Sequence, residues 1–123
     1  MKREIKFKAK SIYNDEWVYG DLLHQIDGTH IYIGKGGNGR TLCPRVDPST
    51  VCQFTGLKDY EGNNIWEGDI AECEIYDLYK GFIKVKAVIE YMYGAFVAII
   101  DGIPNSLYFK YIKVIGNKFD NDK

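Results

Sequence analysis

The chain has 123 residues, of which 46% are hydrophobic, and its formal net charge is −1. This apolar content argues against disorder, and the length is sufficient for a core without disulfide or metal staples. No apolar run reaches roughly 18 residues and no signal peptide is seen, so we expect neither a membrane partner nor secretion. A charge near zero does not favour a dedicated binder of polyanions.

Glycine and tyrosine are abundant, with 13 and 10 residues, and β-branched and aromatic side chains fill the stretches between the glycines. This composition is typical of strands joined by tight turns. The sequence therefore predicts an all-β protein.

The first strand is predicted from a strict alternation of apolar residues with Lys6, Lys8 and Lys10, which would leave one face lined by lysines. Residues 17–23 and 29–33 then predict a hairpin. We expect a type I′ turn at its centre, because Asp27 is followed by Gly28.

Residues 34–48 are rich in glycine and then interrupted by proline, which predicts a loop with at most a short strand near residues 40–43. Within them, residues 34–39 match the dinucleotide-binding pattern G-x-G-x-x-G. That chemistry needs a helix behind the glycines, and Pro44 and Pro48 forbid it, so we expect a hairpin tip and no cofactor. Residues 48–54 are interpreted as a bridge inside a single domain, between subdomains 1–54 and 55–123.

In the second half, residues 71–75 and 83–91 alternate between apolar and charged side chains, which predicts two amphipathic strands. The first segment also fits helical spacing through Leu78 and Tyr79, but its Gly-Asp entry and alternating charge favour a strand. Residues 95–100 are continuously apolar, as in a strand buried on both faces. Residues 107–115 are predicted as the last strand.

The three cysteines, Cys43, Cys52 and Cys73, show no C-x-x-C spacing. An odd number of thiols indicates reduced cysteines packed in the core. A zinc site would need His24 and His30, which lie six residues apart with no cysteine pair beside them, so no metal is expected.

No serine lies in a nucleophile-elbow context, and neither histidine has a motif-linked acid. Glu72 and Glu74 fit the polar face of a strand. The sequence therefore predicts a non-enzymatic protein without catalytic residues.

Two tight turns stand out between residues 55 and 70. Asp59-x-x-Gly62 fits a turn in which the carboxylate accepts backbone N–H groups and the glycine has a positive φ. A second reversal is predicted at three successive residues, Glu67, Gly68 and Asp69. Trp66, just before it, offers the largest apolar area of this stretch to a core.

These residues also form a longer pattern, T-G-L-x-D-x-x-G-x-x-I-x-E-G-D-I, at residues 55–70. With R-E-I-K-F-x-A at residues 3–9, W-V-Y-G-D-L at 17–22 and V-I-G-N at 114–117, the chain resembles the YopX-like family of phage and prophage proteins. It departs from the family at Lys8, where arginine is usual, and in a tail without Asn-Pro.

The resemblance implies a phage or prophage protein of the bacterial cytoplasm that has no established activity. It also implies a small β-barrel architecture, with an N-terminal β-hairpin subdomain and a C-terminal SH3-like barrel.

The leading functional hypothesis is a protein-interaction or assembly module. The basic N-terminus has a local charge of +4, whereas residues 57–123 carry 8 basic and 11 acidic side chains. Opposite charges favour a homo-oligomer, and a phage or host protein is the other partner considered.

Nucleic-acid binding is the alternative, through Lys6, Lys8 and Lys10 beside the stacking ring of Trp17. Lysines on an edge strand also serve simply to block aggregation. Trp66 is the second aromatic candidate for a partner contact, if it is exposed rather than buried.

Overall fold

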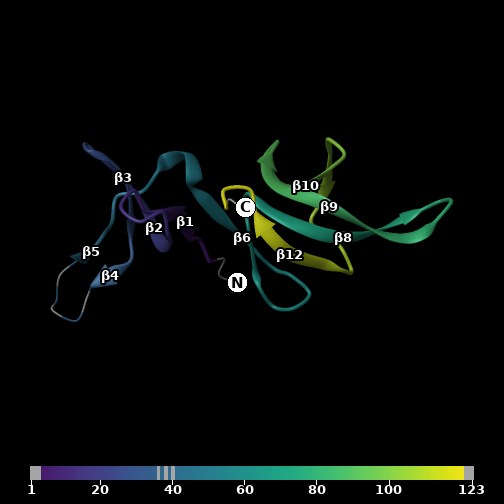
Figure 1. Cartoon of the computed structure of the whole chain (residues 1–123), viewed down its shortest axis with the longest axis horizontal. Coiled ribbons are helices and arrows are strands. Elements are labelled where there is room, and N and C mark those ends of the chain that lie inside the picture. The colour runs from purple at the N-terminus through teal and green to yellow at the C-terminus, as the bar shows by residue number, and fades with distance from the viewer. Residues whose placement is uncertain (1–3, 36, 38, 40, 121–123) are drawn as a thin grey trace. The chain divides into compact units, whose positions relative to one another are not determined.

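The computed structural model describes residues 4–120 apart from residues 36, 38 and 40, and these residues form an all-β protein, as predicted (Figure 1). Backbone contacts divide the chain into two compact units, Met1–Phe54 and Thr55–Lys123. The described strands are β1 (Phe7–Lys10), β2 (Trp17–Gln25), β3 (Gly28–Tyr32), β4 (Gly34–Lys35), β5 (Thr41–Leu42), β6 (Cys52–Lys58), β7 (Asn64–Trp66), β8 (Asp69–Asp77), β9 (Gly81–Met92), β10 (Ala95–Ile100), β11 (Ile103–Ser106) and β12 (Ile112–Asn117).

The described strands form two five-stranded sheets, in the orders β3-β2-β1-β6-β7 and β11-β10-β9-β8-β12, and a two-stranded β4-β5 sheet. Antiparallel pairing joins β1 to β2 and β6, β2 to β3, β4 to β5, β8 to β9 and β12, and β10 to β9 and β11. Neither five-stranded sheet returns to its first strand within the described residues, so both sheets are open and the expected small β-barrel is not confirmed. Among the described strands, the outer strands of the second sheet, β11 and β12, each pair with a single neighbour.

The N-terminal unit is built on the β2–β3 hairpin, which the sequence predicts. The expected type I′ turn is wrong: Gln25 pairs with Gly28, so the chain reverses at Ile26 and Asp27, and neither has the positive φ that such a turn requires. Ala9, Ile31 and Val46 form the core of this unit. The glycine-rich pattern at residues 34–39 begins with β4 and leads towards β5, and its residues 36 and 38, like residue 40, are not among those that the structure describes.

The C-terminal unit has its core on one face of the second sheet. Two of its turns fit type I′ geometry, because both central residues have positive φ: Tyr93 with Gly94, and Asp101 with Gly102. The second turn leads into β11, a strand the sequence interpretation missed. The buried core residues are Ile65, Ala71, Cys73, Ala87, Ile89, Ala98, Ile100 and Ile112.

Two predictions about this unit need correction. Residues 95–100 are not buried on both faces, since within β10 only Ala98 and Ile100 are fully buried. Residues 107–115 do not form one strand, because β12 begins only at Ile112. Residues 71–75, in contrast, lie in a strand and not in a helix.

The Asp59 turn has the geometry that the sequence predicts. One carboxylate oxygen accepts the N–H groups of Glu61 and Asn63, at 3.0 and 2.8 Å, and Gly62 has φ +89°. The other oxygen accepts the N–H of Val114 at 2.9 Å, which links the turn to β12. Burial raises the pKa of Asp59, but these donors together outweigh it and hold the pKa below its ordinary value.

The second turn is held by Asp69, whose side chain is buried. One carboxylate oxygen accepts the N–H of Trp66 at 2.8 Å, and the other accepts the side-chain amide of Asn117 at 3.0 Å. Gly68 has φ +87°, and Glu67 completes the reversal between β7 and β8. Both acidic turns therefore contact β12, far away in sequence.

We expect Gly62→Ala to destabilise the protein by about 1 kcal/mol, because a Cβ is penalised at positive φ. Apart from Gly62 itself and its two chain neighbours, no described atom lies within 4 Å of the position a Cβ would take, so the penalty comes from the local backbone conformation alone. Gly116→Ala is the matched control, since Gly116 has equally open space and no positive φ. Urea unfolding measures both variants, and an equal effect of the two would contradict the turn assignment.

Candidate interaction surfaces

The lysines of β1 share one face of the sheet with aromatic side chains of β2. Lys10 pairs with Trp17 in the register and Lys8 pairs with Tyr19. The Nζ atoms of Lys8 and Lys10 lie 4.4 and 5.3 Å from the centroid of the Trp17 ring, within cation–π range. The Nζ atom of Lys6 lies 5.6 Å from the centroid of the Phe54 ring. The structure thus brings Lys8, Lys10 and Trp17 together, as predicted, whereas Lys6 lies against a different ring.

The expected lysine face is nevertheless not a solvated one. Lys8 and Lys10 are only 7% and 9% exposed, so β1 is covered on both of its faces. Lysine stems pack along the neighbouring ring, and the Nζ of Lys10 also lies 3.9 Å from a carboxylate oxygen of Asp15. Alternation identified the face correctly but not its burial. The remaining basic positions, Lys2 and Arg3, lie outside the described residues.

Trp66 is 6% exposed, the result expected if it is part of a core and not a surface contact. Cys52 and Cys73 are buried, as predicted, whereas Cys43 is only partly buried. Burial, and then the negative charge of Glu72, raises the pKa of the Cys73 thiol to about 11. This thiol is therefore a poor nucleophile at neutral pH.

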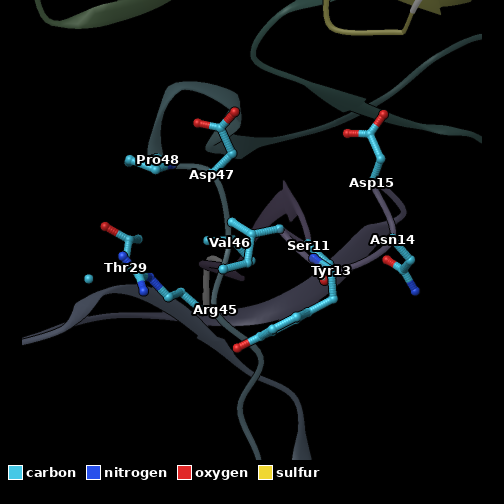
Figure 2. A pocket seen from close by; sticks show the side chains of 11 residues that line it. Ser11, Tyr13, Asn14, Asp15, Thr29, Arg45, Val46, Asp47 and Pro48 are labelled. Atoms are coloured by element: carbon cyan, nitrogen blue, oxygen red, sulfur yellow. Dashed lines mark hydrogen bonds between the residues drawn. The ribbon is translucent and has the colours of Figure 1, made fainter.

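A hollow of about 540 Å³ opens on the N-terminal unit (Figure 2). In this view the carboxylates of Asp15 and Asp47 point the same way, while the ring of Tyr13 lies on the other side of Val46. Ser11 is buried and its Oγ accepts the N–H of Tyr13 at 3.1 Å. Among the described residues, the lining contains hydroxyl and carboxylate groups but no histidine or cysteine.

His30 forms a second polar cluster on the same unit. Its Nδ1 lies 2.9 Å from the carbonyl oxygen of Cys43, and its Nε2 lies 2.9 Å from a carboxylate oxygen of Asp27. Two acceptors can be satisfied together only by the doubly protonated ring. The Cys43 carbonyl, and then the Asp27 carboxylate, raise the pKa of His30, while the hydrogen bond from His30 lowers the pKa of Asp27. No group of three potential metal ligands occurs in the part of the chain that the structure describes.

This pair predicts a defined pH dependence of stability. The contribution of His30, whose folded pKa is raised, is complete below its ordinary value of 6.5 and is lost as the pH rises through the folded pKa. The contribution of Asp27, whose folded pKa is lowered, is present above 3.8 and is lost as the pH falls through the folded pKa. We expect Asp27→Asn to lower the unfolding midpoint at about pH 6 and to have progressively less effect towards about pH 8.5.

Asp21→Asn, on the same hairpin, is the control for a change of charge alone. Chemical unfolding at a series of pH values measures all three proteins. A difference between wild type and Asp27→Asn that stays constant across this range would contradict the pairing.

The β8–β9 hairpin carries a group of exposed apolar side chains at its end. Its end exposes Tyr76 by 62%, Leu78 by 84%, Tyr79 by 96% and Phe82 by 71%. The rings of Tyr76 and Phe82 face each other across the strands, edge to face, with centroids 5.2 Å apart. We call these four residues the arm tip.

The arm tip is presented by an ordered turn. A carboxylate oxygen of Asp77 accepts the N–H groups of Tyr79 and Lys80, at 2.8 and 3.0 Å. Gly81 has φ +78° and pairs with Asp77, which closes a three-residue hairpin loop. The aromatic side chains are therefore held by backbone geometry at the end of a long hairpin, which Figure 1 shows extending from the sheet.

The sequence interpretation did not identify the arm tip as a site. A signal was present, because Tyr76 follows Glu72 and Glu74 at every second position and so belongs to the polar face of the strand. An aromatic residue in line with carboxylates indicates an exposed ring. Among the described residues, no helix is long and apolar enough to cross a membrane.

The comparisons with known proteins agree with this fold. The family model described as YopX protein matches residues 4–123. A solved crystal structure, that of protein EF1440 from Enterococcus faecalis, is similar to this chain with a TM-score of 0.57 and 24% sequence identity, over 94% of each chain. At that identity the likeness shows a shared fold only. No curated protein matches the chain.

Proposed function

The chain belongs to the YopX family, and on that premise we propose that it is a phage- or prophage-encoded interaction or assembly module that acts by binding protein and not by catalysis. Its place of action in this proposal is the bacterial cytoplasm. The proposal also relates residues 55–123 to SH3-type barrels. Its support is a five-stranded antiparallel sheet with tight hairpin turns and a one-sided core.

The observation that carries the proposal is the arm tip. Three aromatic side chains and one leucine, each more than half exposed, stand together on an ordered hairpin end. An aromatic side chain covers roughly 150–250 Å², so the tip exposes several hundred Å² of largely apolar surface, the upper range for a soluble monomer. Surfaces of this kind mark protein–protein contacts, in which tyrosine and phenylalanine are enriched.

Nucleic-acid binding stays as the second candidate because Lys8 and Lys10 lie over the ring of Trp17. Its weakness is the burial of both lysines, since phosphate contacts need accessible ammonium groups. The two candidates differ in one property. A nucleic-acid binder has an affinity for DNA that falls steeply as salt rises.

We expect a photo-crosslinking amino acid at position 79 to form protein adducts in the bacterium that carries the gene. Tyr79 is almost fully exposed at the arm tip, so the replacement leaves the core intact. The same amino acid at position 26 is the control, because Ile26 is fully exposed on the hairpin of the other unit. Gel analysis and mass spectrometry identify the adducts.

Adducts at position 79 and not at position 26 are the predicted result. The proposal is overturned if position 79 gives no protein adduct while the purified chain binds single- or double-stranded DNA in a salt-dependent manner. Absence of both adducts and DNA binding would also overturn it.

A further inference from the structure

We propose that the partner of the β8–β9 hairpin is a second copy of the same chain, bound through one face of the hairpin with both arms pointing in the same direction. This inference rests on the proposed function and names its partner. The arm comprises residues 72–86. Its outer face is formed by the side chains at alternate positions of the two strands: Glu72, Glu74, Tyr76, Phe82, Lys84 and Lys86.

The outer face has its two charges sorted into columns. The acidic residues Glu72 and Glu74 lie on β8, and directly opposite them on β9 lie Lys86 and Lys84. At the end of the columns stand Tyr76 and Phe82, one from each strand. The face therefore has an acidic edge, a basic edge and an aromatic end.

Such a face is complementary to itself in one orientation only. A two-fold axis that runs along the strands, between two outer faces, places β8 of one copy over β9 of the other. Each glutamate then meets a lysine at the same level, and Tyr76 meets Phe82. An axis across the strands would place glutamate on glutamate, which is repulsive.

Within the residues that the structure describes, no ion pair joins the glutamates of β8 to the lysines of β9. Glu72 accepts the hydroxyl of Tyr111 at 3.1 Å, and the Nζ of Lys84 lies 4.6 Å from the same ring. The side chain of Tyr111 therefore lies against the outer face and adds a further aromatic ring to it.

One further charge borders this face. Lys113 of β12 pairs with Glu72 in the register, and its Nζ lies 4.0 Å from a carboxylate oxygen of Glu61. Because Lys113 and Glu61 have opposite charges, together they add no net charge beside the arm.

The area fits a dimer. A stable interface buries roughly 800 Å² on each partner. Tyr76 and Phe82 provide part of this, since each aromatic residue covers roughly 150–250 Å², and the two charged columns with Tyr111 provide the rest. The aromatic end supplies apolar burial, while the columns fix the orientation.

The test uses sedimentation velocity of the purified full-length chain over a wide range of concentrations. Wild type is expected to dimerise reversibly. An acidic variant, Lys84→Glu with Lys86→Glu, and a basic variant, Glu72→Lys with Glu74→Lys, should each self-associate about a hundredfold more weakly, because like charges then face each other. Mixed together, the two variants should form a one-to-one complex.

A third variant combines all four changes and exchanges the two columns. It restores opposite charges both within each chain and between copies, so it should dimerise as wild type does. Phe82→Ser should weaken dimerisation, and Tyr108→Ser, which removes an even more exposed ring elsewhere on the unit, should not. Circular dichroism verifies the folding of each variant.

The inference is overturned if wild type stays monomeric, if the acidic variant dimerises like wild type, or if the folded acidic and basic variants fail to associate when mixed. If the acidic or the basic variant does not fold, the third variant, which combines all four changes, is the deciding test. The inference is then overturned if that variant is folded and monomeric. A monomeric wild type whose position 79 still crosslinks to a different protein would remove the second copy as partner and leave the proposed function standing.

Discussion

The buried carboxylate of Asp69 is the interaction on which the C-terminal unit depends. A carboxylate taken out of water must have its oxygens satisfied, and here one is bound by the N–H of Trp66 and the other by the amide of Asn117. The first bond fixes the turn into β8, and the second fixes β12 beside it. Asp59 repeats the arrangement one turn earlier through the N–H of Val114. Two acidic turns therefore hold the last strand of the unit in place.

This fixed base explains how the arm can project. β12 pairs with β8 only as far as Cys73, and β10 pairs with β9 only from Val88 onward, so the end of the hairpin pairs with itself. Two strands alone are marginally stable in water. Ile75 and Val85 pack against the core on the inner face, which leaves the outer face of the arm to contact other molecules. A second copy on that face would stabilise the part of the hairpin that the chain itself supports least.

Sequence reasoning succeeded where the chemistry is local. The two acidic turns were predictable because a carboxylate two to four residues from its N–H donors, with a glycine at positive φ, needs no distant information. β11 was missed because Pro104 argues against a strand, although an edge strand such as this one tolerates proline. The burial of the lysines in β1 could not be predicted from the sequence either. Alternation placed Lys8 and Lys10 on one face, but the ring of Trp17 that covers them comes from the register of another strand. In the arm, the same alternation identifies which side chains form the outer face, but it does not show that no other part of the chain covers them.

Hydrogen–deuterium exchange of the wild-type chain at low and high protein concentration tests this account most directly. The account predicts that amides of residues 74–84 exchange quickly in dilute protein and become protected as concentration rises. It also predicts that amides of residues 112–117 are protected at every concentration, because Asp59 and Asp69 hold that strand within each chain. Exchange in the arm that is independent of concentration, or rapid exchange throughout residues 112–117, would contradict it.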